Sequence, residues 1–123
     1  MRTFVIDSIS AVTLEMRGQI VVTGSHGGIS AAHLALAHPP SLAVFNDAGM
    51  GLDGAGIKGL DLLNASNVAA CAVSHISARI GEAKSTFATG EISAVNSLAV
   101  RAGICIGLPC SEAINLFNNR SLH

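Results

Sequence analysis

The stretch Gln19-Ile20-Val21-Val22-Thr23-Gly24-Ser25-His26-Gly27-Gly28 decides the fold, together with residues 29–37 that follow it. Residues 20–22 are apolar and β-branched, as expected of a strand that is covered on both faces. A polar turn rich in glycine comes next, and residues 29–37 carry apolar side chains at helical spacing. Two prolines then end the helix, because the residue before a proline avoids the α conformation. The stretch therefore predicts a strand, a sharp turn and a helix.

The order of strand, polar turn and helix recurs along the chain. Apolar runs predict further strands at 41–45 and 68–73, and Asp53 is a suitable N-cap for a helix at 53–64. The remaining predicted elements are short strands at 4–6 and 104–106, helices at 91–102 and 109–118, and an irregular polar segment at 76–90. Alternating strands and helices indicate a parallel sheet with helices on both faces. We therefore predict a single α/β domain over residues 1–123, with a mainly parallel sheet of about four or five strands and flanking helices.

The composition excludes some partners and favours others. A net charge of −1 gives no electrostatic attraction to nucleic acid, and the bases would find neither Trp nor Tyr to stack on. No apolar run reaches the roughly 18 residues that a membrane-spanning helix needs. Charged residues make up only 12% of the chain, well below the usual share, so we expect part of the surface to be buried in a homo-oligomer.

The cysteines and the N-terminus indicate a cytoplasmic protein. Three cysteines cannot all pair with one another, and none of them forms a C-x-x-C motif, so reduced thiols are expected. The N-terminal segment reaches an acidic residue at Asp7 before any long apolar run, which is not the pattern of a signal peptide.

Polar residues follow each of the three best-defined strands. Ser25-His26 comes after the first strand, Asn46-Asp47 after the second and Ser74-His75 after the third. The carboxyl ends of parallel strands lie at the same edge of a sheet, and such sheets bind ligands at that edge. The sequence therefore predicts a site for a small molecule there.

The turn Thr23-Gly24-Ser25-His26-Gly27-Gly28 resembles the nucleophile elbow of the α/β-hydrolase family, which places small-x-Ser-x-Gly between a strand and a helix. The resemblance covers about residues 20–47. It implies that Ser25 is a nucleophile. The family's chain order of serine, acid and histidine is matched by Ser25, Asp47 and His75.

Two other interpretations of this turn stay open. The N–H groups of Gly24, Gly27 and Gly28 could bind an anion without covalent chemistry, with Ser25 donating a hydrogen bond and His26 lining the pocket. The turn could also be purely structural, because glycine allows chain segments to approach closely.

The expected roles centre on proton transfer. We assign it to His75 and Asp47, because a neutral imidazole suits acid–base chemistry near neutral pH. Ser25 and His26 would attack or bind the substrate, and Arg79 would hold an anion or else pair with Glu82 at the surface. The predicted substrate-binding residues are Gly24, Gly27, Gly28, Asn46, Ser74, Ser77 and Arg79.

These residues favour an enzyme acting on a small polar or anionic molecule, either a hydrolase or a lyase or isomerase that uses His–Asp proton transfer. The alternative is a non-catalytic subunit that binds an anion or small ligand, or an accessory subunit of a larger enzyme. Neither an organic cofactor nor a metal is predicted. Residues 49–54 match G-x-G-x-x-G, but the acid expected roughly 20 residues later in a dinucleotide site is absent. The histidines also lack the H-x-x-x-H spacing typical of metal ligands.

Overall fold

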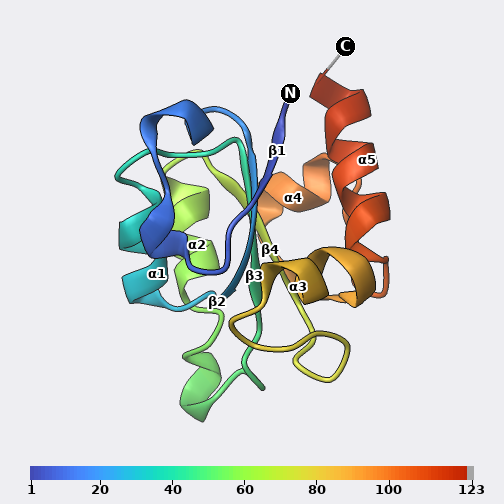
Figure 1. Cartoon of the computed structure of the whole chain (residues 1–123). Coiled ribbons are helices and arrows are strands. Elements are labelled where there is room, and N and C mark those ends of the chain that lie inside the picture. The colour runs from blue at the N-terminus through green and yellow to red at the C-terminus, as the bar shows by residue number, and fades with distance from the viewer. Residues whose placement is uncertain (122–123) are drawn as a thin grey trace.

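A five-stranded sheet forms the centre of the computed structural model, which describes residues 1–121 (Figure 1). The strands lie side by side in chain order: β1 (Thr3–Val5), β2 (Ile20–His26), β3 (Leu42–Asn46), β4 (Ala69–Val73) and β5 (Ile92–Val95). The first four are parallel, and β5 runs antiparallel to β4. The predicted α/β fold with a mainly parallel sheet is therefore confirmed.

Helices cover both faces of this sheet (Figure 1). One face carries α1 (Ile29–Ala35), α2 (Gly59–Ala65) and the short 3₁₀ turns η1 (Ile9–Ala11) and η2 (Leu14–Met16). The other face carries α3 (Ala83–Thr89), α4 (Ser97–Arg101) and α5 (Cys110–Ser121). Among the helices of residues 1–121, none has both the length and the apolar character that a membrane crossing requires.

The two helical layers create two hydrophobic cores, one on each face of the sheet. Successive residues of a strand point to opposite faces, so Val21 and Phe45 pack under α1 and α2, while Val22 and Val44 pack under the opposite layer. Every residue of β3 and β4 is buried. This double burial explains why the central strands are uniformly apolar instead of alternating.

The segment after β3 differs from the prediction. The predicted helix at 53–64 begins only at Gly59, and Asp53 is not its N-cap. Asp53 lies instead in the 3₁₀ turn η3 (Leu52–Gly54), with a φ of 53° in the left-handed region. The glycines of this segment favour tight turns over a regular helix, and they delay the start of α2.

The C-terminal third contains the other differences. Residues 83–89, predicted to be irregular, form α3, and the predicted helix at 91–102 is divided into β5 and α4. Ile92 and Ala94 are buried while Ser93 is half-buried, which is the alternation of a strand with one better-covered face. The predicted strand at 104–106 does not form, because only Ile104 of these residues is buried and the chain turns there.

Candidate functional site

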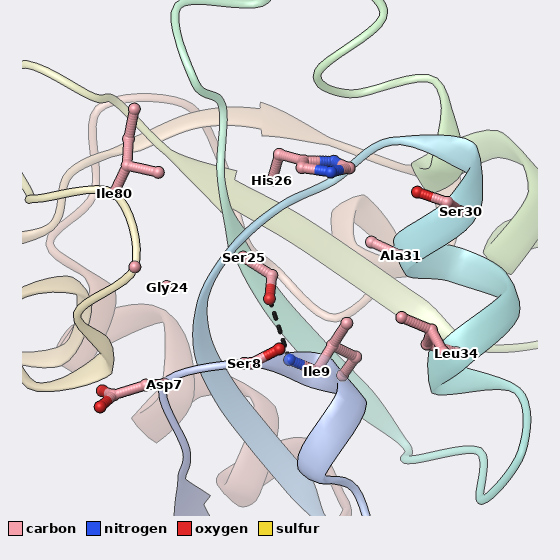
Figure 2. A pocket seen from close by; sticks show the side chains of 11 residues that line it. Asp7, Ser8, Ile9, Gly24, Ser25, His26, Ser30, Ala31, Leu34 and Ile80 are labelled. Atoms are coloured by element: carbon pink, nitrogen blue, oxygen red, sulfur yellow. Dashed lines mark hydrogen bonds between the residues drawn. The ribbon is translucent and has the colours of Figure 1, made fainter.

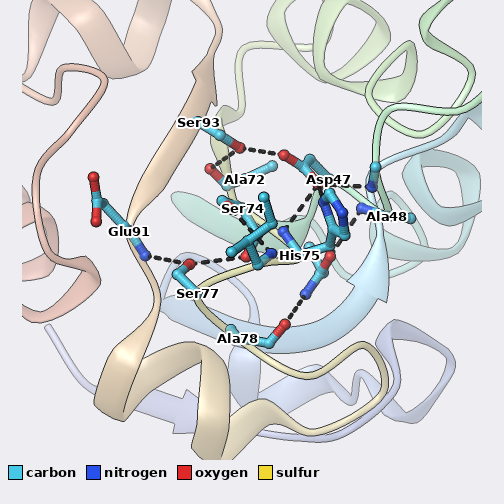
Figure 3. Close-up of polar contacts among 12 residues, drawn as sticks. Asp47, Ala48, Ala72, Ser74, His75, Ser77, Ala78, Glu91 and Ser93 are labelled. Atoms are coloured by element: carbon cyan, nitrogen blue, oxygen red, sulfur yellow. Dashed lines mark hydrogen bonds and ion pairs between the residues drawn. The ribbon is translucent and has the colours of Figure 1, made fainter.

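The carboxyl edge of the sheet brings Asp47 and His75 together (Figure 3). Asn46 at the end of β3 pairs with Val73 at the end of β4, so the residues that follow these two strands are neighbours. The ring atom His75 Nδ1 lies 3.2 Å from Asp47 Oδ1, and the main-chain N–H of His75 donates to the same oxygen at 3.1 Å. Two of the three predicted polar strand ends therefore meet.

Asp47 is held by hydrogen bonds on both carboxylate oxygens. Its exposed fraction is only 4%. Oδ1 also accepts from the N–H of Gly49 at 2.8 Å, and Oδ2 accepts from the hydroxyl of Ser93 at 2.7 Å. Burial by itself raises the pKa of Asp47, but the hydrogen bonds from Ser93, Gly49 and His75 outweigh burial and lower that pKa below its ordinary value. Asp47 is therefore ionised at neutral pH.

The ionised carboxylate fixes the tautomer of the His75 ring. A carboxylate can only accept hydrogen bonds, so the neutral imidazole carries its proton on Nδ1. Nε2 is then left with a free lone pair. The side chain of His75 is 46% exposed, so Nε2 is available to a molecule from solution. This arrangement suits a general base.

The backbone after Asp47 adopts a strained conformation that supports this pair. Ala48 and Met50 have φ values of 52° and 66°, which non-glycine residues rarely adopt. Their N–H groups donate to Asn46 Oδ1 at 2.8 Å and to the main-chain oxygen of Asp47 at 2.7 Å, so the loop folds back over both residues. Asn46 is fully buried and its amide donates to Ala78, so Asn46 holds two loops together and does not face a ligand.

A hollow of about 510 Å³ lies next to the loop that carries His75; neither His75 nor Asp47 lines it, and it adjoins the pair through Ser74 and Ser93. Its lining residues include Ser74, Ser77, Glu91 and Ser93, with Ile76 on the apolar side. The Ser77 hydroxyl donates to the main-chain oxygen of Ser74 and accepts from the N–H of Glu91 (Figure 3). Ser77 therefore braces the loop against β5. Ser93 connects the hollow to Asp47, because its hydroxyl both borders the hollow and binds the carboxylate.

Ser25 lies away from this pair. It belongs to β2, and its Oγ accepts a hydrogen bond of 2.9 Å from the N–H of Ile9 (Figure 2). No hydrogen bond joins Ser25 to Asp47 or His75 within residues 1–121. The serine thus lacks the histidine that a nucleophile elbow requires.

The glycines of the turn serve close packing. The N–H groups of Gly24, Gly27 and Gly28 donate to Asp7 O at 3.0 Å, Gly56 O at 2.7 Å and His26 Nδ1 at 3.0 Å. A Cβ added to Gly24 would overlap the backbone where residues 81 and 82 cross β2. All three N–H groups are engaged inside the protein and do not form an anion nest. The structural interpretation of the turn fits these contacts.

Of the two roles predicted for Arg79, anion binding or a surface pair with Glu82, the structure shows the surface pair. Its guanidinium lies 3.9 Å from the carboxylate of Glu82, and the two side chains are 81% and 56% exposed. A pair this exposed contributes little to stability. Arg79 does not line the hollow that Ser74 and Ser93 border, and its guanidinium lies beside Glu82 at the surface.

Sequence reasoning missed Ser93. The predicted helix at 91–102 includes Ser93, whereas β5 runs antiparallel and begins at the carboxyl edge, which brings Ser93 to Asp47. The β-branched residues Ile92 and Val95 were the available signal of a strand.

Comparisons with models of known families, with curated proteins and with solved structures found no match. Across the part of the chain that the structure describes, no three His, Cys, Asp or Glu side chains are placed to hold a metal ion. The fold and the site together define an α/β domain with a buried carboxylate and a half-exposed histidine at the carboxyl edge of its sheet.

Proposed function

We propose that this protein is an enzyme that transfers a proton on a small polar molecule, with His75 as the general base and acid. The observation that carries the proposal is the contact of 3.2 Å between the half-exposed His75 ring and the buried carboxylate of Asp47. Asp47 fixes the tautomer of the ring and stabilises the imidazolium that forms when Nε2 takes a proton. Such a step is common to isomerases and lyases.

The hollow beside the pair supports a small polar substrate. Three serine side chains and Glu91 offer hydrogen-bonding groups, while Ile76 and Ile106 give it an apolar wall. Covalent attack by Ser25 is not part of the proposal, because its hydroxyl has no contact with His75 in the structure.

Proton abstraction can be tested before the natural substrate is identified. A panel of small ketones, keto acids and hydroxy acids is incubated with the protein in D₂O, and deuterium entry at carbon is followed by NMR. We expect exchange into at least one carbonyl compound. The variants His75→Asn and Asp47→Asn should reduce the rate about 10²- to 10⁴-fold.

The matched control for this assay is His33→Asn, because His33 is an exposed histidine on α1 that lies outside the site. Its rate should equal that of the wild type. Exchange that survives in folded His75→Asn, or that fails for every compound of the panel, would contradict the acid–base proposal.

We also propose that the chain forms a homo-oligomer. Only 12% of the residues are charged, and the apolar side chains of Leu14 and Leu52, which do not line the hollow, are 66% and 84% exposed and are available to a second copy. Light scattering should give a mass that is a multiple of the 12.5 kDa chain. A monomeric mass at high protein concentration would refute this proposal.

A further inference from the structure

A second cavity, of about 370 Å³, surrounds Ser25 (Figure 2). It lies between the N-terminal loop, the end of β2, α1 and the segment at Ile80. It shares no lining residue with the hollow beside His75. Its volume is within the range of small-molecule sites. The glycine-rich turn at Ser25 thus opens onto a space of its own.

Two hydrogen-bond donors border this cavity. The Ser25 oxygen accepts from the N–H of Ile9, which occupies one of its lone pairs and leaves the hydroxyl hydrogen to donate. His26 Nδ1 accepts from the N–H of Gly28, so the neutral ring carries its proton on Nε2 and can donate from there. The Ser25 hydroxyl can therefore donate to an oxygen atom in the cavity, whereas Figure 2 shows the ring of His26 directed toward the start of α1 and away from that hydroxyl.

Asp7 is the acidic residue that lines the cavity, and its carboxylate does not face Ser25. Figure 2 shows the carboxylate of Asp7 pointing away from Ser25, and its Oδ1 accepts from the N–H of Ala83 at 3.0 Å. The rest of the wall contains the hydroxyls of Ser8 and Ser30 together with apolar side chains. Ile9 and Ala31 are buried, while Leu34 and Ile80 are 46% and 57% exposed and would be covered by an apolar group.

We infer that the cavity at Ser25 is a second small-molecule site, which binds a short apolar chain ending in a carboxylate or carbonyl oxygen without covalent chemistry. The Ser25 hydroxyl donates to the oxygen, and the chain packs against Leu34 and Ile80. The serine acts here as a donor and needs no base.

Titration of ¹⁵N-labelled protein with sodium butyrate tests this site, with butyramide and butylamine as comparison ligands. Butyrate should shift the amide signals of Ile9, Ser25 and Ala31 in a saturable way, with a Kd on the order of 1 mM. Binding of butyramide as well identifies a carbonyl oxygen as sufficient, whereas binding of butyrate alone identifies a carboxylate. Butylammonium, which offers only donors, should not bind.

Two variants separate binding from folding. Ser25→Ala should weaken butyrate about 3- to 10-fold through loss of one hydrogen bond. Leu34→Glu, at a half-exposed helix position, removes no hydrogen bond; it should weaken butyrate far more than butyramide by charge repulsion. Ser66→Ala, an exposed serine far from the cavity in sequence, is the control and should leave the affinity unchanged.

Several results would overturn the inference. They are the absence of saturable shifts with butyrate and butyramide, equal binding of butylammonium, or shifts centred on His75 and Ser93. Unchanged butyrate affinity in a folded Leu34→Glu variant would do the same. The titration measures binding and not turnover, so its result is independent of the acid–base proposal.

Discussion

Replacing Ser93 with alanine removes the hydroxyl that donates to Asp47 Oδ2 at 2.7 Å. The hydroxyl's other contact, to the main-chain oxygen of Ala72, is at 3.5 Å and is weak. The substitution therefore isolates one charge-assisted hydrogen bond. Because Asp47 is 4% exposed, water replaces the lost donor poorly. We expect the free energy of unfolding at pH 7 to fall by about 2 kcal/mol.

The loss should depend on pH in a defined direction. Burial raises the pKa of Asp47, but hydrogen bonds, with that from Ser93 contributing most, lower it below the ordinary value. A carboxyl group with a lowered pKa stabilises the fold above its ordinary pKa, and that contribution is lost as the pH falls and the group is protonated. The cost of Ser93→Ala should therefore be largest at neutral pH and shrink below about pH 4.

Urea unfolding measures this cost, and at pH 7 the midpoint should fall by about 1 M for a chain of this length. A double-mutant cycle with Asp47→Asn assigns it to the pair, because the cost of Ser93→Ala should largely disappear in that background. Ser66→Ala, at an exposed position, should change stability by less than about 0.5 kcal/mol. An equal cost with and without the Asp47 carboxylate would show that the loss does not arise from the hydrogen bond between Ser93 and Asp47.

Three further predictions concern Asp47, two glycines and the cysteines. The Tm of the wild type should drop as the pH falls below about 4, since protonation removes the stabilising charge of Asp47, and Asp47→Asn should flatten that dependence in a thermal scan. In the same urea assay, Gly24→Ala should lower the free energy of unfolding by about 3 kcal/mol, because the added Cβ overlaps the backbone of residues 81 and 82. Gly54→Ala should lower it by only about 1 kcal/mol, because Gly54 has a φ of 73° but open space around it. Maleimide should label only Cys105 in the folded protein, as detected by mass spectrometry, because Cys71 and Cys110 are buried. Burial also raises the pKa of Cys110 to about 12, which keeps this thiol protonated and unreactive. Labelling of Cys71 or Cys110 without unfolding would contradict the described core.

The centre of the sheet could be predicted because its residues leave little choice. Residues 20–22, 41–45 and 68–73 are short, uniformly apolar runs between turn-forming residues, and a strand buried on both faces is the structure that such runs favour. The polar ends of two of these strands, at Asp47 and His75, meet because adjacent parallel strands end at the same edge.

The remaining parts depend on tertiary contacts that local patterns do not encode. The direction of β5 is set by its packing on β4, and this direction brings Ser93 to Asp47. Ser25 shares an edge with Asp47, but its hydroxyl faces the N-terminal loop at Ile9, which no local pattern around the turn indicates. The left-handed residues between 48 and 54 likewise follow from the hydrogen bonds around Asn46 and Asp47, and they displace the start of α2.

The imidazole ¹⁵N chemical shifts of His75 report which ring nitrogen carries the proton, and they therefore test the acid–base site itself. In its neutral form His75 should be the Nδ1–H tautomer, held by Asp47, and this preference should be lost in Asp47→Asn. His26 serves as an internal control and should show the opposite, Nε2–H tautomer, because its Nδ1 accepts from Gly28. An Nε2–H tautomer for His75, or a preference that Asp47→Asn leaves unchanged, would contradict the proposed acid–base site.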